Sequence, residues 1–130
     1  MKIFIKIIFY IALFNALNIH NTSAEEKIKI GLLVPLTGPD KEMGDSIIKS
    51  VRMAINKIDN PLIEILPKDT GSNPQLTLIN AKNLKKNGVK IIIGPVFNKN
   101  LIYLDQVKDV IFLSLTNKII DNPKNIISAG

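Results

Sequence analysis

Few side chains in this 130-residue sequence could take part in chemistry, and the most suggestive ones follow apolar segments. Hydroxyl and amide groups occur in three such places, the segments PLTG (35–38), GPVFN (94–98) and SLTN (114–117). These groups exchange hydrogen bonds without ionising, which suits the binding of a small polar ligand. A glycine at the second place would let backbone come close to the ligand, and Pro95 would hold the turn. The candidate ligand-binding residues are Thr37, Gly94, Asn98, Ser114 and Thr116, with Asn117 as a further polar side chain.

Each of these segments also has an ordinary structural interpretation. Gly-Pro after a strand is common turn chemistry, and Ser, Thr or Asn after a strand often caps a helix. Asp69 in KDTG is interpreted first as a turn residue and second as an acid in a cleft. A single segment is therefore better explained as structural, and the convergence of all three at one edge would indicate a cleft.

The composition excludes several classes of catalyst. The sequence has no cysteine, and its one histidine, His20, lies within the first 24 residues. The remainder therefore has no imidazole or thiol for acid–base chemistry, nucleophilic attack or metal binding. Neither a glycine-rich phosphate loop nor a suitable pair of carboxylates is evident. We expect a binding protein rather than an enzyme, with no cofactor and no metal.

The formal net charge of +6 is weak support for a nucleic-acid partner. The lysines are scattered along the chain, and the few aromatic residues would make a poor stacking surface for bases. Binding to nucleic acid is therefore not predicted.

The first 24 residues have the pattern of an export signal. Lys2 and Lys6 provide a positive start, residues 7–14 form an apolar stretch, and small residues end at Ala24. This pattern predicts a signal peptide cleaved after Ala24, with an uncleaved membrane anchor as the alternative. An exported protein without disulfides fits a bacterial periplasm. We therefore predict a periplasmic protein with a mature chain of residues 25–130.

Strand and helix patterns alternate along the rest of the chain. Strands are predicted over residues 27–36, 62–67, 89–94 and 110–116, and a fifth starts within 125–130. A helix over 41–58, with Asp40 as its N-cap, would bury apolar residues at three- and four-residue spacing. A second helix over 76–86 would have Asn73 as cap and Pro74 in its first turn. A third, short helix is predicted from about Asn98. The expected buried residues of the first helix are Ile47, Ile48, Val51, Ala54, Ile55 and Ile58, and those of the third are Leu101, Leu104 and Val107.

This order predicts an α/β fold, a parallel sheet with helices on both faces. Strands so continuously apolar are typical of such sheets, and each crossover should be right-handed. Ligands of open parallel sheets bind beyond the carboxyl ends of the strands, where loops from different strands converge. The three polar segments would meet at that edge, together with the N-termini of the helices starting near Lys41 and Asn98.

Two long segments resemble the type 1 periplasmic binding proteins that include the leucine/isoleucine/valine-binding proteins. They are IKIGLLVPLTGPDKEMGDSIIKSVRMAINKID and EILPKDTGSNPQLTLINAKNLKKNGVKIIIGPVFN. They are especially similar to the variant domain of penicillin-binding-protein activators. The resemblance implies a flavodoxin-like lobe of a two-lobed receptor that closes on a small ligand. Residues 25–130 would be the N-terminal part of the first lobe, so we expect an incomplete lobe, a fragment of such a receptor.

The resemblance implies one of two functions. The first is a periplasmic solute-binding protein for an ABC-type uptake system, with an amino acid or similar ligand and an inner-membrane ABC permease as partner. Such receptors usually place a serine in the loop after the third strand, where this sequence has Phe97 and Asn98. After the fourth strand they tend to show Ser-Pro, where this sequence has Ser114-Leu115. These departures are compatible with the alternative, an activator-like interaction domain that regulates cell-wall synthesis by contacting a cell-wall synthase.

Overall fold

The computed structural model of the chain describes residue 3, residues 25–116 and residues 123–129. The predicted signal peptide and its cleavage site lie outside the described residues, apart from Ile3, and so does Asn117. Within the described part of the chain, no helix has the length and apolar character needed to cross a membrane.

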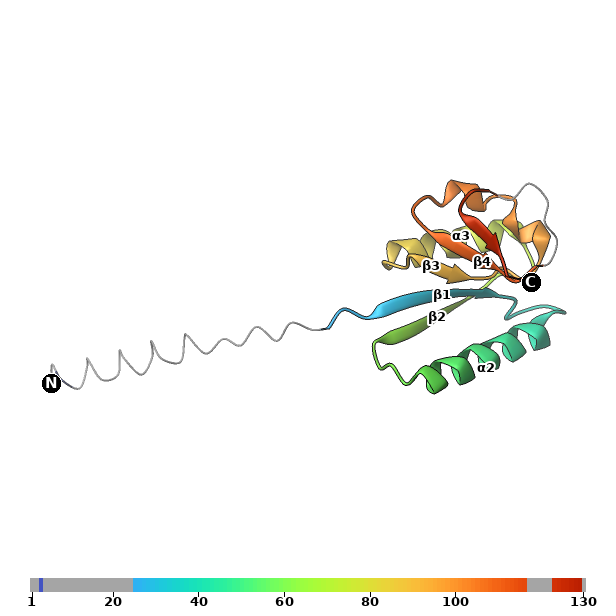
Figure 1. Cartoon of the computed structure of the whole chain (residues 1–130). Helices are drawn as coiled ribbons and strands as arrows, with labels where there is room; N and C mark the ends of the chain where they lie inside the picture. Colours follow the sequence, from blue (N-terminus) through green and yellow to red (C-terminus); the bar gives the residue numbers. More distant parts are fainter. Residues whose placement is uncertain (1–2, 4–24, 117–122, 130) are drawn as a thin grey trace.

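Five parallel strands form one sheet, as the sequence predicts (Figure 1). Their order across the sheet is β2-β1-β3-β4-β5. The strands β1, β3 and β4 are shorter than predicted, whereas β2 extends two residues beyond its predicted end, to Asp69. Their bounds are β1 Ile28–Val34, β2 Ile63–Asp69, β3 Ile91–Ile93, β4 Ile111–Ser114 and β5 Ile126–Ser128.

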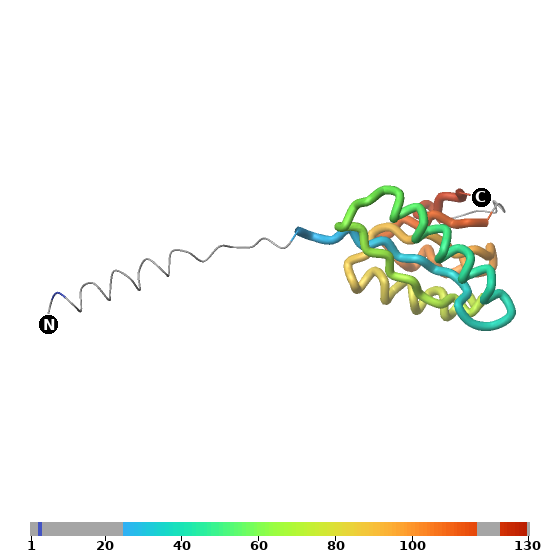
Figure 2. Tube along the Cα trace, turned by 90° about the horizontal axis from the view of Figure 1, so that it is seen from below, coloured from blue at the N-terminus to red at the C-terminus, as the bar shows by residue number. Residues whose placement is uncertain are grey.

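Two α-helices cover opposite faces of this sheet. The helix α2, Lys41–Ile58, joins β1 to β2, and the helix α3, Pro74–Lys86, joins β2 to β3. Figure 2 shows the strands between the two helices. The chain moves one way across the sheet from β1 to β2 and the other way from β2 to β3. Right-handed crossovers therefore put the two helices on opposite faces.

The third predicted helix begins at Asn98, as the sequence indicates. The structure has two short 3₁₀ helices, η1 (Asn98–Leu101) and η2 (Leu104–Gln106), instead of an α-helix. The predicted apolar residues Leu101, Leu104 and Val107 are all buried. They recur every three residues, and a 3₁₀ helix has three residues per turn, so this spacing keeps them on one face.

The hydrophobic core lies almost entirely on the α3 side of the sheet. There Gly31 leaves no room for a side chain, because an added Cβ would lie 2.8 Å from Leu84 and 2.9 Å from Ile92. Leu32 and Val34 are the buried apolar residues that do not belong to this cluster. The cluster consists of Leu33, Ala81, Leu84, Val89, Ile92, Leu101, Leu104, Val107, Val110, Phe112 and Ile126.

The helix α2 is much less buried than the sequence predicts. Among its residues only Gly44 is buried, and Ala54 and Ile58 are exposed. Gly44 contacts the backbone at the end of β1, where an added Cβ would lie 1.7 Å from the carbonyl oxygen of Pro35. The helix is therefore held closely at its first turn, while its predicted buried face is only partly covered.

The predicted caps differ between the two helices. The side chain of Asn73 caps α3 by accepting a hydrogen bond from the N–H of Leu76 at 2.9 Å, as predicted. Asp40 occupies the N-cap position of α2, as predicted, but its side chain makes no capping hydrogen bond. Its carboxylate instead accepts a hydrogen bond from the hydroxyl of Ser72 at 2.6 Å. The backbone of Asp40, with φ −93° and ψ 10°, lies outside the extended region that is typical of a capping residue.

Candidate functional site

The loops after β1 and β2 are joined by hydrogen bonds at the carboxyl edge of the sheet. The Asp69 carboxylate, at the end of β2, accepts hydrogen bonds from the Thr37 hydroxyl at 2.6 Å and the Leu36 N–H at 2.7 Å. It also accepts one from the N–H of Gly71 at 2.8 Å. The Asp40–Ser72 hydrogen bond joins the same two loops. Asp69 thus performs the turn role predicted first and also holds the exposed residue Thr37 in place.

The surroundings of Asp69 favour its ionised form. Partial burial of the carboxyl raises its pKa, but the hydrogen bonds donated by Thr37, Leu36 and Gly71 outweigh this effect. The pKa of Asp69 therefore lies below the ordinary value of an aspartate. The ionised carboxylate of Asp69 therefore joins the two loops. Its oxygens accept hydrogen bonds mainly from donors of this chain.

Three N–H groups at the start of α2, where the sequence suggests unpaired groups, are hydrogen-bonded within the chain. The N–H of Lys41 donates to the carbonyl of Gly38 at 3.3 Å, and the N–H of Met43 donates to the carbonyl of Asp40 at 3.1 Å. The N–H of Gly44 donates to the same Asp40 carbonyl. Because these groups are already paired, a ligand at this edge gains little from the helix terminus.

The backbone at Gly94 packs closely against the backbone of β1 and does not face open space. It has a φ of +100°, is followed by a cis peptide bond to Pro95, and is buried. A Cβ at this position would lie 2.2 Å from the carbonyl oxygen of Leu33 in β1. The N–H of Gly94 also donates to the carbonyl of Leu113 at 2.8 Å. The close approach that the sequence predicts is therefore made to β1.

Ser114 and Thr116 are buried behind the turn that contains Pro95. The Ser114 hydroxyl donates a long hydrogen bond of 3.4 Å to the Pro95 carbonyl and accepts one from the Thr116 N–H at 3.3 Å. The N–H of Leu115 donates to the same Pro95 carbonyl at 3.0 Å. This network connects the ends of β3 and β4. It supports the rim of the candidate site from inside the protein.

Asn98 and Thr37 are the predicted site residues that remain accessible. Thr37 is exposed in the loop after β1, and Asn98 is half-buried at the start of η1. The structure thus brings the predicted residues to one edge but divides them by burial. Gly94, Ser114 and Thr116 build the turns, and Thr37 and Asn98 are available at the surface.

Asn100 is a polar residue near this edge that sequence reasoning missed. It lies in η1, is buried, and neither its amide nitrogen nor its amide oxygen has a hydrogen-bond partner. In the sequence it belongs to the polar run NKN, which is typical of an exposed turn. No sequence signal distinguishes it from Asn98, because the burial comes from how η1 folds.

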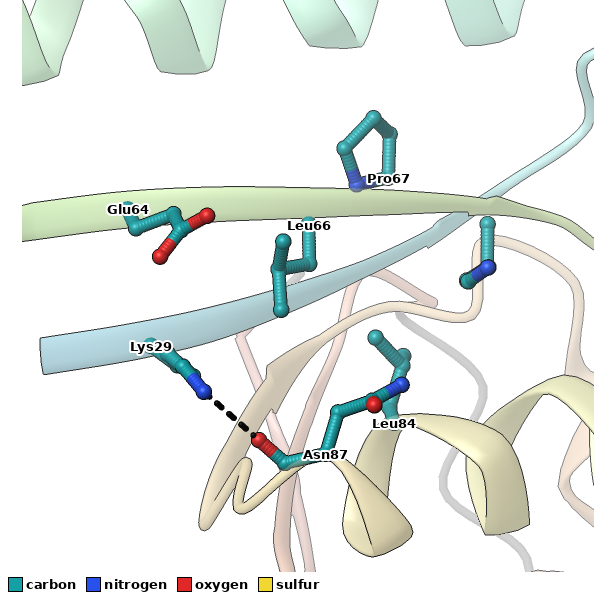
Figure 3. A pocket seen from close by; sticks show the side chains of 7 residues that line it. Lys29, Glu64, Leu66, Pro67, Leu84 and Asn87 are labelled. Carbon is teal, nitrogen blue, oxygen red and sulfur yellow. Dashed lines mark hydrogen bonds between the residues drawn. The ribbon is translucent and has the colours of Figure 1, made fainter. Parts of the chain in front are cut away.

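A groove of about 390 Å³ lies away from this edge, along β2 on the α3 side (Figure 3). Figure 3 shows Lys29 and Glu64 at one end of it and Leu84 on its floor. The Lys29 ammonium donates a hydrogen bond to the carbonyl oxygen of Asn87 at 3.1 Å. No group of three metal-binding side chains forms among the described residues. Its lining includes the polar residues Lys29, Glu64, Lys68 and Asn87 but none of the site residues that the sequence predicts, which lie at the carboxyl edge.

Comparison with protein families gives one clear match. A family model described as periplasmic binding protein matches residues 27–122, about three quarters of the chain. The matched region includes all three polar loops and the strands β1–β4. No curated protein sequence gives a significant match.

Solved structures of similar fold come from two kinds of protein. The C-domain of LpoA from Haemophilus influenzae, a regulator of PBP1A, matches 69% of this chain with a TM-score of 0.59 and 26% identity. An ABC-type branched-chain amino acid transporter protein from Rhodopseudomonas palustris matches 80% with a TM-score of 0.67 and 20% identity. A solute-binding protein from R. palustris in complex with 4-hydroxybenzoate matches 70% with a TM-score of 0.64 and 22% identity. The matched parts are 28%, 32% and 27% of those chains, so this chain spans less than a third of each.

Proposed function

The chain belongs to the periplasmic binding protein family, and we propose that it forms part of a solute receptor for an ABC-type uptake system. The ligand is an amino acid or a similar small polar solute, and the partner is the permease in the inner membrane. The protein is exported to the periplasm, and its signal peptide is cleaved after Ala24. Its role is binding rather than catalysis. The family match over residues 27–122 carries this proposal.

The geometry of the carboxyl edge supports solute binding there. Thr37 is held in place by Asp69, and Asn98 stands at the start of η1 after β3. We assign direct ligand contacts to these two residues, because their side chains are accessible. Gly94, Ser114 and Thr116 act on the ligand through the turns that they hold. All five predicted residues thus belong to the proposed site, two as ligand contacts and three as supports of its turns.

A binding screen on the intact protein tests this function. The ligands are the common amino acids and small aromatic carboxylates such as 4-hydroxybenzoate, which one structural neighbour binds. We expect at least one of them to raise the melting temperature, because a ligand that binds only the folded state stabilises it. Titration calorimetry on the same sample then gives the affinity. If no solute in either class binds, the receptor function is wrong.

A second function is favoured by one feature of the site. The loop after β3 carries Phe97, with the Lys99 ammonium 5.7 Å from its ring centre, and Ser114 is fully buried. A solute carboxylate would therefore find fewer hydroxyl donors at this rim than the sequence suggests. These observations, with the 26% identity to LpoA, support an interaction domain that regulates a cell-wall synthase. Direct binding of the intact protein to a purified synthase, without any small solute, would establish this alternative.

A further inference from the structure

Lysines that are scattered along the sequence lie together in the structure, at the end of α3. The end of α3 and the starts of β1 and β3 share one edge of the sheet, opposite to the carboxyl edge (Figure 1). There the Lys29 ammonium donates a hydrogen bond of 3.1 Å to the carbonyl of Asn87. The Lys85 ammonium forms an ion pair of 3.4 Å with Asp109, in the loop before β4. The lysine surface at this edge consists of Lys29, Lys82, Lys85, Lys86, Lys90 and Lys108.

The segments that carry these lysines adjoin one another. Because residues three and four apart are neighbours on a helix, Lys82 lies beside Lys85 on α3. The carbonyl of Lys90, just before β3, accepts a hydrogen bond of 2.9 Å from the N–H of Ile111 in β4. The loop before β4, which carries Lys108, therefore lies beside Lys90. The fold thus makes one surface from four separate segments of the chain.

The lysine surface has a strong positive charge. The helix α3 has no acidic residue, and two carboxylates lie beside the surface, Asp109, which pairs with Lys85, and Glu64 of the neighbouring groove. The acidic pair Glu25-Glu26 precedes β1 in a segment that leads away from the sheet (Figure 1). Six ammonium groups against the two adjacent carboxylates leave a formal charge of +4. The exposed lysines of this surface that form no ion pair with any described residue are Lys82, Lys86, Lys90 and Lys108.

Helix stability explains only part of this surface. Cations stabilise the C-terminus of a helix, and Lys85 and Lys86 occupy the last turn of α3. Lys29 donates to a carbonyl at the same helix end. The lysines for which helix stability gives no reason are Lys82, Lys90 and Lys108.

We propose that the lysine surface binds the anionic headgroups of phospholipids and holds the protein on the periplasmic face of the inner membrane. Clusters of about four to eight basic residues are typical of surfaces that attract anionic lipids. Residues 25–27 lead into β1 at this edge, so an export signal before them would hold the same edge toward the membrane. The inference rests on the export proposed above, and it does not depend on the solute.

The composition of the lysine surface favours a lipid surface over a protein or a nucleic acid. Protein interfaces are depleted in lysine and enriched in aromatic residues, and single-stranded nucleic acid stacks its bases on aromatic side chains. The segments that carry the surface, residues 27–31, 74–91 and 107–111, contain no aromatic residue. Lysine is a flexible, strongly hydrated point charge, whereas arginine recognises phosphate with a fixed, bidentate geometry. Six lysines and no arginine therefore suit the mobile headgroups of a bilayer.

Binding through this surface leaves the candidate site free. The lysine surface lies at the amino ends of the strands, whereas Thr37 and Asn98 follow their carboxyl ends. The seven residues of β1 separate the two edges by roughly 20 Å. Because charges are screened over about 8 Å at physiological ionic strength, lipid at one edge has little effect on a solute at the other.

Vesicle binding by the mature intact protein, purified without solute, tests the proposal. The vesicles contain phosphatidylcholine with or without phosphatidylglycerol, and flotation separates bound from free protein. Each lysine near an anionic bilayer strengthens binding about fivefold, so Lys86→Gln with Lys90→Gln should weaken it about 25-fold. The matched control is Lys49→Gln with Arg52→Gln, which removes the same charge from exposed positions of α2 on the other face of the sheet. We expect the control to bind as the unchanged protein does, and added NaCl to release both.

Several outcomes would overturn the proposal. They are equal binding to vesicles without phosphatidylglycerol, equal losses in the two double variants, and release by inorganic phosphate at constant ionic strength. Tighter binding to a soluble oligonucleotide than to the anionic vesicles would assign the surface to nucleic acid instead. If Lys86→Gln with Lys90→Gln does not fold, Lys82→Gln with Lys108→Gln makes the same charge change in the lysine surface. Because no solute is present, a failed solute screen leaves this result unaffected.

Discussion

The Thr37 hydroxyl donates a hydrogen bond of 2.6 Å to the Asp69 carboxylate, across two loops that are 32 residues apart in sequence. The same carboxylate accepts N–H groups from both loops. A residue available to a ligand is therefore held by one that serves the fold.

Replacing Asp69 by asparagine should destabilise the protein. The amide keeps the shape of the side chain, but it loses the charge and presents an NH₂ group to one of the present donors. We expect the free energy of unfolding to fall by about 1–2 kcal/mol, as for the loss of hydrogen bonds to a charged group. Urea denaturation measures this change. The exposed Asp105→Asn serves as control and should leave the midpoint unchanged.

The low pKa of Asp69 predicts a pH dependence of stability. Between its folded and unfolded pKa values, the unfolded chain binds more protons than the folded protein, so stability rises with pH there. The contribution is fully present above the unfolded value of about 3.9 and is lost as the pH falls through the lower folded value. Thr37→Val removes a donor and should raise the Asp69 pKa toward its ordinary value. NMR titration of the carboxyl carbon checks this, and an unchanged pKa in the variant would contradict the assignment.

Two glycines with positive φ should respond differently to alanine. Gly94 has φ +100° and a Cβ there would lie 2.2 Å from the Leu33 carbonyl, whereas Gly38 has φ +80° with open space around it. Gly38→Ala therefore bears only the conformational cost, about 1 kcal/mol. Gly94→Ala adds a clash with backbone, and we expect a loss above about 3 kcal/mol in the free energy of unfolding. Equal midpoints for the two variants in guanidinium denaturation would show that the β1–β3 contact relaxes freely.

Asn98 is accessible and Ser114 is buried, so substitutions at these two positions should affect different properties, ligand affinity at Asn98 and melting temperature at Ser114. Asn98→Ala should weaken solute binding about tenfold, as for one lost hydrogen bond of about 1.4 kcal/mol, and leave the melting temperature of the ligand-free protein unchanged. Ser114→Ala should lower the melting temperature without a comparable loss of affinity, because the hydroxyl contacts Pro95 and Thr116 inside the protein. Calorimetry and thermal melts on the same samples separate the two. A loss of affinity in Ser114→Ala alone would reverse the assignment.

Local sequence patterns predicted most of the fold correctly. The runs of β-branched residues around Ile30 and Ile92 indicated strands, and Asn73 with Pro74 indicated the start of α3. The pattern was insufficient from Asn98 onward, because buried residues at three-residue spacing fit one face of either an α-helix or a 3₁₀ helix over such a short length. The sequence placed Asp40 correctly at the N-cap of α2, but it could not show that the Asp40 carboxylate accepts a hydrogen bond from Ser72, a distant residue, and none from the helix.

The sequence by itself determined that apolar strands alternate with helices and that small polar residues follow three of the strands. These are local properties, set by the period of the side chains and by turn chemistry. Only the tertiary structure decided which of those polar residues reach the surface. It buried Ser114 and Asn100, and it left Ile111 exposed on an apolar strand. The physical reason is that burial depends on which elements cover each face of the sheet. Among the described helices that connect strands, the handedness of the crossovers puts all except α2 on one side.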